Sequence, residues 1–422
     1  MKSFTTIWLG QIVSLLGSAM TWFAFTIWAW QKTGEVTALS TISFFAFLPT
    51  VLFTPFAGVL VDRWNRKLVL MLSDMASALG TLAALILHAT DNLQIWHIYI
   101  IGILAGFFTA FQYPAYAASV TTLVPKENYA RAEGMLGLAA ALSGILAPIF
   151  AASLLGRIGL SGIMLIDLLT FLAAFGTLLW VRIPQPQVSE TGQTSRGSLW
   201  QETRFGFSYI RQRPSLRALT ILFMSANIFL AIGATLMAPL ILSGTGNSES
   251  ALATVMSTGA FGGVVGGGLL SIWGGPRKRI YGVLLGGIGA SLFGILWLGL
   301  SQTILLWALG GFFFAFFEPF VEGGNLAIWQ SKVEADVQGR VFSARQLLVQ
   351  IPYLLGIFVS GYLAEAWAIA PVFIVAGVCG LIIFAAGYLF RNVRMAESLL
   401  ADAQTSSDDR KIDSNPQREF RE

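Results

Sequence analysis

Two glutamates lie one helical turn apart inside a long apolar stretch near residue 316. Glu318, Glu322 and Asn325 follow one another at spacings of four and three residues. That spacing places all three side chains on one face of an α-helix. Repulsion between two neighbouring carboxylates favours protonation of one of them, so the pair could carry a proton. The pattern predicts that this face lines a polar cavity.

Four further ionisable side chains lie in apolar stretches, where a charge costs at least about 2.5 kcal/mol. They are Asp74, Glu133, Asp167 and Arg345. Glu133 and Arg345 open their predicted helices, where a carboxylate complements the helix dipole and an arginine reaches the membrane surface. Asp74 and Asp167 lie nearer helix ends, where either a hydrogen bond between helices or proton transfer would suit them. The candidates for proton coupling are Glu318, Glu322, Asp74 and Asp167.

The chain contains an internal repeat with a constant offset. Adding 209 to a position carries Gly58 onto Gly267, Trp64 onto Trp273 and Arg131 onto Arg340. Matches at Trp and Arg are hard to produce by chance in a chain this rich in Leu and Gly. The repeat therefore predicts two related halves of roughly six helices each, a common plan of membrane transporters.

The same offset relates polar faces in the two halves. It carries the face of Glu318 and Asn325 back onto residues 109–116, and it carries Ser18 onto Asn227. We expect these faces to oppose each other across a central cavity; alternatively, the small hydroxyl and amide groups only join helix to helix. The predicted cavity residues are Gln11, Ser18, Thr109, Gln112, Tyr113, Tyr116, Asn227, Glu318, Glu322 and Asn325.

Membrane-spanning helices are the elements that must carry these residues. The 422-residue chain is 55% hydrophobic and 11% charged, with a mean hydropathy of +0.70, whereas soluble domains are about 25% charged. A span needs about 20 apolar residues, and twelve stretches qualify, centred near residues 17, 49, 78, 107, 143, 170, 229, 261, 289, 316, 352 and 380. Continuous apolar runs exclude β-barrel strands, which alternate over about ten residues. The predicted fold is all-α: an integral membrane protein with twelve transmembrane helices in two pseudo-symmetric six-helix bundles.

Basic residues predict the orientation in the membrane. With the N-terminus in the cytoplasm, every one of the 26 Lys and Arg except Lys32 and Arg157 falls on the cytoplasmic side, as the positive-inside rule requires. The net charge of +4 therefore reflects topology, and no clustered basic face indicates nucleic-acid binding. We expect a multi-pass protein of the plasma or inner membrane with both termini cytoplasmic.

Two polar segments divide the chain. Residues 183–214 contain Trp200, Phe207 and Ile210 among arginines, which fits an amphipathic helix on the inner membrane surface or, equally, a solvated linker. The hydrophilic tail at 392–422 is expected to be disordered. The predicted parts are an N-terminal six-helix bundle (1–182), a cytoplasmic linker (183–214), a C-terminal six-helix bundle (215–391) and the tail (392–422).

A glycine-rich run at residues 259–268 superficially suggests a phosphate-binding loop. It lies in an apolar span, however, and no Lys-Ser or Lys-Thr pair follows it. Close helix packing through Gly262 and Gly266 is the preferred interpretation. No cofactor is expected, and no metal site either, because the two histidines have no acidic or cysteine partners at metal-binding spacing.

Residues 58–67, GVLVDRWNRK, resemble the G-x-L-x-D-R-x-x-R-K loop that joins the second and third helices of the major facilitator superfamily. In that family the glycine allows close helix contact, and the aspartate caps the eleventh helix and closes the cytoplasmic side. The resemblance assigns these parts to Gly58 and Asp62, whereas Ser271 replaces the aspartate in the second half. The predicted cytoplasmic gate consists of Gly58, Asp62, Arg63, Arg66, Arg131, Arg340 and Arg345.

Further stretches, PAYAASVTTLVPKENYARAEGML and IWQSKVEADVQGRVFSARQLL, resemble the macrolide-efflux-like branch of the drug:proton antiporters, which also includes siderophore exporters. The resemblance implies a secondary active transporter, not an enzyme, that exports an amphiphilic drug-like compound or natural product in exchange for protons by alternating access. We expect it to act in the lipid bilayer as a monomer. The alternatives are an importer or facilitator of a small nutrient on the same fold, or a membrane sensor or scaffold that transports nothing.

Overall fold

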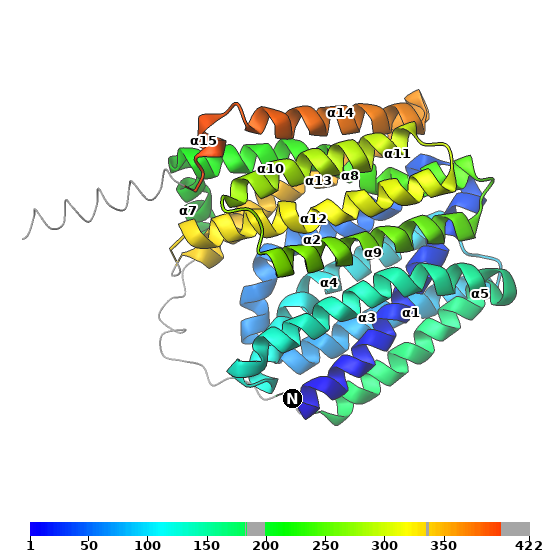
Figure 1. The fold of residues 1–422 in the computed structure, drawn as a ribbon. Coiled ribbons are helices and arrows are strands. Elements are labelled where there is room, and N and C mark those ends of the chain that lie inside the picture. Colours follow the sequence, from blue (N-terminus) through cyan, green and yellow to red (C-terminus); the bar gives the residue numbers. More distant parts are fainter. Residues whose placement is uncertain (182, 184–198, 335–336, 398–422) are drawn as a thin grey trace, which may run out of the picture.

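The computed structural model describes residues 1–181, 183, 199–334 and 337–397, which form helices and turns without strands. In the first half, Figure 1 shows α1 (Lys2–Thr33), α2 (Val36–Arg63), α3 (Arg66–Ala89), α4 (Ile95–Leu123) and α5 (Tyr129–Trp180), with a short 3₁₀ turn η1 (Lys126–Asn128) before α5. The second half contains α7 (Leu199–Gln212), α8 (Pro214–Gly244), α9 (Glu249–Trp273), α10 (Arg279–Gly289), η2 (Ala290–Leu296), α11 (Trp297–Leu300), α12 (Ile304–Lys332), α13 (Gln338–Trp367), α14 (Ile369–Gly387) and α15 (Arg391–Arg394).

The predicted twelve spans are confirmed, although two of them share one helix. Eleven described helices are long and apolar enough to cross a membrane. One of them, α5, has 52 residues and bends at Gly159, whose backbone is not helical (φ 66°, ψ −178°). Glycine tolerates this positive φ because it has no Cβ. The bend turns α5 into two antiparallel arms (Figure 1), and each arm accounts for one predicted span.

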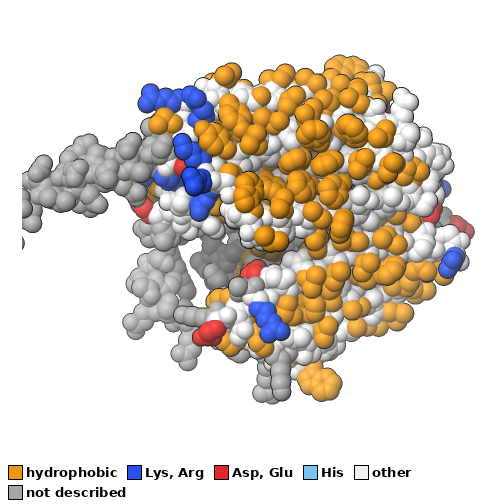
Figure 2. Space-filling model, viewed as in Figure 1, with side chains coloured by type: hydrophobic (Ala, Val, Ile, Leu, Met, Phe, Trp, Pro, Cys, Tyr) orange, Lys and Arg blue, Asp and Glu red, His pale blue; other side chains and the backbone are white. Residues whose placement is uncertain are grey.

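The bundle has two chemically different ends. We call the end that holds Met1 and α15 the terminal end, and the opposite end, with the short loops after α1, α3 and α8, the far end. Figure 2 shows basic side chains gathered at the terminal end and apolar side chains spread over the flank between the two ends. Large apolar side chains on this flank, such as Leu172 and Ile382, are 60% exposed. A flank of this kind suits contact with lipid hydrocarbon.

Glycines bring neighbouring helices of the second half into backbone contact. A Cβ added to Gly262 or Gly266 in α9 would collide with the backbone carbonyl of Phe312 or Phe316 in α12. Small residues at helix contacts allow this close approach, which is a main source of stability in membrane bundles. The preferred interpretation of the glycine run as a packing surface is therefore confirmed.

The segment before α8 is helical where the structure describes it. In α7, Tyr209 and Ile210 are buried and Phe207 packs against the same apolar cluster of the second half. Gly206 meets the backbone carbonyl of Arg340 in α13. Residues 184–198 and the side chain of Trp200 lie outside the described part. The apolar face of α7 is thus covered by the bundle itself.

Replacing Gly266 by alanine should destabilise the protein by about 1–3 kcal/mol, because the added methyl group overpacks the contact with α12. Gly268→Ala is the matched control, since a Cβ there meets nothing within 4 Å. Thermal unfolding in detergent should give a lower midpoint for Gly266→Ala than for Gly268→Ala. Equal midpoints would contradict this account of the α9–α12 contact.

Candidate functional site

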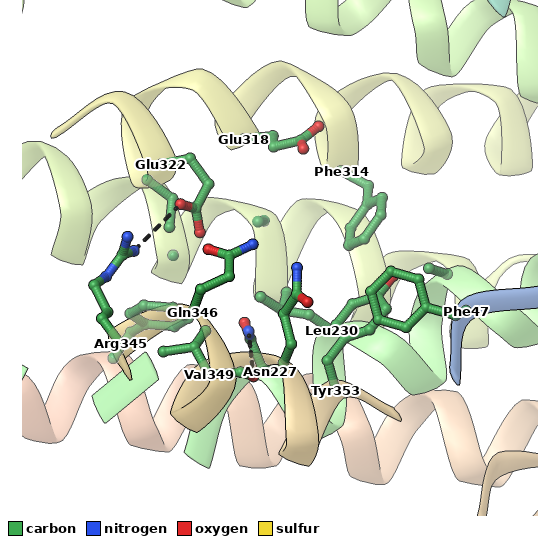
Figure 3. A pocket seen from close by; sticks show the side chains of 16 residues that line it. Phe47, Asn227, Leu230, Phe314, Glu318, Glu322, Arg345, Gln346, Val349 and Tyr353 are labelled. Atoms are coloured by element: carbon green, nitrogen blue, oxygen red, sulfur yellow. Dashed lines mark hydrogen bonds and ion pairs between the residues drawn. The ribbon is translucent and has the colours of Figure 1, made fainter. Parts of the chain in front are cut away.

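A cavity of about 380 Å³ lies in the second half of the molecule. Helices α8, α12 and α13 form most of its wall, and Phe47 of α2 reaches it from the first half. Figure 3 shows the side chains that point into it. Its polar lining residues are Asn227, Glu318, Glu322, Arg345, Gln346, Gln350 and Tyr353, and its apolar ones include Phe47, Leu230, Phe314 and Phe384.

One ion pair and one separate carboxylate set the charge of this cavity. The Arg345 guanidinium lies 3.7 Å from the Glu322 carboxylate and 5.4 Å from the centre of the Trp329 ring. Glu318, one turn along α12, has no cationic partner among the residues that the structure describes. With all three groups ionised, the cavity carries one net negative charge.

Uncharged hydrogen-bonding groups line the opposite wall. The Asn227 side-chain amide donates to the Val349 carbonyl at 3.1 Å, which leaves its Oδ1 to accept from a ligand. Gln346, Gln350 and Tyr353 follow one another at spacings of four and three along α13, so they share one face. Apolar walls with a few fixed polar groups are typical of sites for organic molecules.

The structure brings together only part of the predicted cavity face. Glu318, Glu322 and Asn227 line the cavity, but Asn325 is fully buried and its side-chain amide makes no hydrogen bond. Its neighbour Gly324 packs against Val283 of α10, so α12 is covered by another helix at this level. Asn325 therefore does not line the cavity as expected. Helical spacing predicts the direction of a side chain, but it does not show whether a neighbouring helix covers that side chain.

Arg345 also lies in a different place from the one expected. The sequence assigned it to the gate, whereas the structure places it two turns inside α13, in the cavity wall. It is 8% exposed. Pairing with Glu322 and the face of Trp329 holds its charge inside the bundle, where an unpaired arginine would be costly. Sequence reasoning missed Gln346, Gln350 and Tyr353, although their spacing repeats that of Glu318, Glu322 and Asn325.

The first half contributes less to the cavity than expected. Thr109 lines a cleft between the halves together with Trp22 and Tyr353, and Tyr113 is 77% exposed. The Tyr116 hydroxyl is buried without a hydrogen-bond partner.

The predicted proton-coupling aspartates join helices within the first half. Gln11 and Gln112 each donate to Asp74 at 2.7 Å. Ser18 donates to Asp167 at 2.8 Å. Gln11, Gln112 and Ser18, which were expected in the cavity, thus bridge α1, α3, α4 and α5.

The predicted gate residues occupy the terminal end. Arg66 is buried and donates to the Ala118 carbonyl at 2.6 Å, near the C-terminal end of α4, where a cation complements the helix dipole. Arg131 is exposed. Arg340 is also exposed, and its guanidinium lies 5.2 Å from the centre of the Phe205 ring. The side chains of Gly58, Asp62 and Arg63 lie outside the described part.

The two halves are tied together away from the terminal end. At the far end Trp30 Nε1 donates to Asn247 Oδ1 at 2.7 Å, and the Thr37 backbone N–H and hydroxyl donate to Glu365 Oε1 at 2.9 and 2.7 Å. In the middle of the bundle the Ser257 hydroxyl donates to the Ile145 carbonyl at 2.7 Å.

Comparisons with known proteins agree with this architecture. The family model described as "Major Facilitator Superfamily" matches residues 7–357. The chain is 31% identical over 384 residues to macrolide efflux protein A of Streptococcus pyogenes, covering 89% of this chain and 92% of that protein. It is also 31% identical over 334 residues to macrolide efflux protein A of Enterococcus faecalis, covering 77% of this chain and all of that protein.

Solved structures share the fold at low sequence identity. A crystal structure of a mutant of the nucleoside transporter NupG superposes with a TM-score of 0.73 at 11% identity, covering 90% of this chain and 98% of that one. A bacterial homologue of the iron transporter ferroportin, in an inward-facing state, gives a TM-score of 0.67 at 14% identity, covering 91% of this chain and 98% of that one.

Cysteine labelling should separate the cavity from the packed part of α12. In a Cys379→Ala background, Gln346→Cys should react with a hydrophilic maleimide at least about ten times faster than Asn325→Cys, since only the former side chain faces the cavity. Purified protein in lipid nanodiscs leaves both ends open to the reagent. Equal rates would contradict the placement of Asn325.

Proposed function

Because the chain belongs to the Major Facilitator Superfamily, we propose that it exports an amphiphilic organic compound in exchange for protons, by alternating access of the cavity that α8, α12 and α13 form beside Phe47 of the first half. The chain is a multi-pass membrane transporter and not an enzyme. The observation that carries the proposal is the cavity that combines Glu318, free of any described cation, with aromatic and amide walls. Such a wall accepts a molecule with an apolar body and polar groups.

The direction of transport is inferred from two observations. The relatives in Streptococcus and Enterococcus are named as efflux proteins. The hydrogen bonds that the structure describes between the halves lie at the far end and in the middle of the bundle, whereas basic side chains gather at the terminal end, and cationic ends of membrane proteins face the cytoplasm. We therefore assign the terminal end to the cytoplasm and propose that this state, with the halves joined at the far end, receives substrate from inside the cell.

Proton coupling requires a group that changes its protonation during the cycle. Glu318 faces the cavity and has no cationic partner among the described residues, so it can exchange a proton with water there. A substrate that enters the cavity competes with the proton for this carboxylate. Glu322 is held by Arg345 at 3.7 Å, so it better serves as the fixed negative partner that keeps Arg345 in the wall.

Everted membrane vesicles test this proposal. A macrolide, followed by a panel of other amphiphiles, should dissipate an imposed pH gradient, and Glu318→Gln should reduce this proton movement at least about tenfold because a neutral amide cannot release a proton. Glu133→Gln is the matched control, since Glu133 is an exposed carboxylate at the terminal end. Undiminished proton movement in Glu318→Gln would contradict the assigned role of Glu318.

We further propose that Asp62 closes the terminal end when the halves rock together. α2, which carries Asp62 next to its last residue, already meets α13 toward the far end, where Thr37 bonds Glu365 and Phe47 contacts Tyr353. Val337 precedes α13 as its N-cap and provides no side-chain cap, so backbone N–H groups there can receive a carboxylate.

Asp62→Asn should therefore raise the labelling rate of Gln346→Cys from the terminal end severalfold, whereas Asp62→Glu should leave it near the rate with Asp62. Accessibility measured with an impermeant maleimide checks this. An unchanged rate in Asp62→Asn would count against the proposed gate.

A further inference from the structure

Two buried aspartates in the first half belong to neither the cavity nor the gate. Asp74 of α3 and Asp167 in the second arm of α5 are 7% and 4% exposed. No ion pair to a cation is found for either carboxylate among the described side chains. Neutral donors hold them instead. We use the name N-terminal seam for the polar groups around these two carboxylates between α1 and α3. They are Gln11, Ser18, Asp74, Ser77, Thr81 and Asp167.

The far part of the seam surrounds Asp167. Ser18 of α1 donates to its Oδ1 at 2.8 Å and Thr81 of α3 donates to its Oδ2 at 2.9 Å. The Thr21 hydroxyl lies close enough to influence this carboxylate but outside hydrogen-bond geometry. Asp167 thus faces hydroxyl groups, which can both give and receive a proton.

A small void continues the seam toward Asp74. About 10 Å³ of space lies between α1, α3 and α5, with Asp167, Thr21 and Ser77 in its lining. This volume is close to the minimum that holds one water molecule. Ser77 lies three residues, or roughly one turn, from Asp74 on α3. Ser77 thus lies on α3 between Asp74 and Thr81, which donates to Asp167, and it borders the void that Asp167 also lines.

Two glutamine amides and a tyrosine hydroxyl lie close to Asp74. The amide groups of Gln11 and Gln112 donate to its two oxygens at 2.7 Å, which stabilises the ionised form. The Tyr116 hydroxyl of α4 is buried without a hydrogen bond and is close enough to this carboxylate for the two groups to interact electrostatically. Tyr116 is the titratable group for which an electrostatic interaction with Asp74 is described.

We infer that the N-terminal seam is a second proton-binding site, separate from the substrate cavity, which carries one proton per transport cycle from Asp167 to Asp74. This inference rests on the proposed proton-coupled export. The Asp167 carboxylate takes a proton from water when the far end opens. The proton then passes by way of the water-sized void and the Ser77 hydroxyl to the Asp74 carboxylate, which releases it when the terminal end opens. Each carboxylate gains and loses one proton, so the cycle balances.

Counting protons in proteoliposomes tests the inference. The membrane potential is clamped at zero, and the logarithm of the ratio of substrate concentrations on the two sides of the membrane is plotted against the pH difference. The slope of this plot equals the number of protons coupled to each substrate molecule. The probe is a radiolabelled macrolide or, if macrolides are not exported, the amphiphile that the vesicle panel identifies. Asp74→Asn and Asp167→Asn should each lower this slope by one, while substrate exchange at equal pH stays within about twofold, and Asp74→Glu should keep the original slope.

Unchanged slopes in both asparagine variants, with exchange retained, would overturn the inference while leaving the proposed function intact. A zero slope in the unsubstituted protein would overturn both.

A serine substitution decides the matter if the asparagine variants lose exchange. Ser77→Ala should slow uptake driven by a pH gradient at least about fivefold without slowing exchange. Ser73→Ala is its control, because the Ser73 hydroxyl bonds the carbonyls of Val69 and, at 3.4 Å, Phe108, and Ser73 does not line the void. Equal uptake rates in the two serine variants would overturn the proton path.

Discussion

A charge inside the hydrocarbon of a bilayer must find a partner or face water, and this constraint determines where the polar groups of this protein lie. The energy at stake is at least about 2.5 kcal/mol for each charge. Arg345 meets this requirement by pairing with Glu322 at 3.7 Å. Asp74 meets it by accepting hydrogen bonds from two glutamine amides at 2.7 Å. Glu318 instead faces the cavity, where water or substrate can meet it. The groups that can change charge are thus few and separately placed.

Because charges are so costly in a bilayer, the rest of the bundle is held together by close packing between helices. Without water to drive apolar side chains together, helices in a membrane gain stability where small residues let their backbones touch. Gly262 and Gly266 provide such contacts between α9 and α12, and Gly356 of α13 meets the carbonyl of Ile228 in α8. These contacts pack the helices of the second half closely against one another. Between the halves, polar contacts such as Trp30 with Asn247 and Thr37 with Glu365 accompany apolar packing, because one buried apolar cluster contains residues of both halves, such as Phe25 and Leu236.

Hydrophobic length and the internal repeat predicted the spans and the two halves, because a bilayer imposes one length on every helix. The bend at Gly159 was not predicted, since the turn within α5 depends on a single glycine with positive φ. Helical spacing identified the cavity face at Glu318 and Glu322. It could not show that α10 covers the level of Asn325, or that Arg345 meets Glu322, because both depend on contacts between helices.

The hydrogen bond between Ser18 and Asp167, which are 149 positions apart in the chain, is another contact that the sequence could not predict. The sequence showed that both residues are polar groups in apolar spans. Only the fold shows that the Ser18 hydroxyl donates to the Asp167 carboxylate. Substitutions at such pairs affect two helices at once, so the seam and the cavity are better judged by transport measurements than by stability alone.

The central claim is that one cavity opens alternately at the two ends of the bundle. Distances between spin labels measure this directly, with one pair at Lys32 and Ser250 near the far end and another at Arg131 and Lys278 near the terminal end, all on exposed positions. Lowering the pH and adding substrate should lengthen the far-end distance in part of the population and shorten the terminal-end distance in the same part. Distances that stay fixed, or that change in the same direction at both ends, would contradict alternating access.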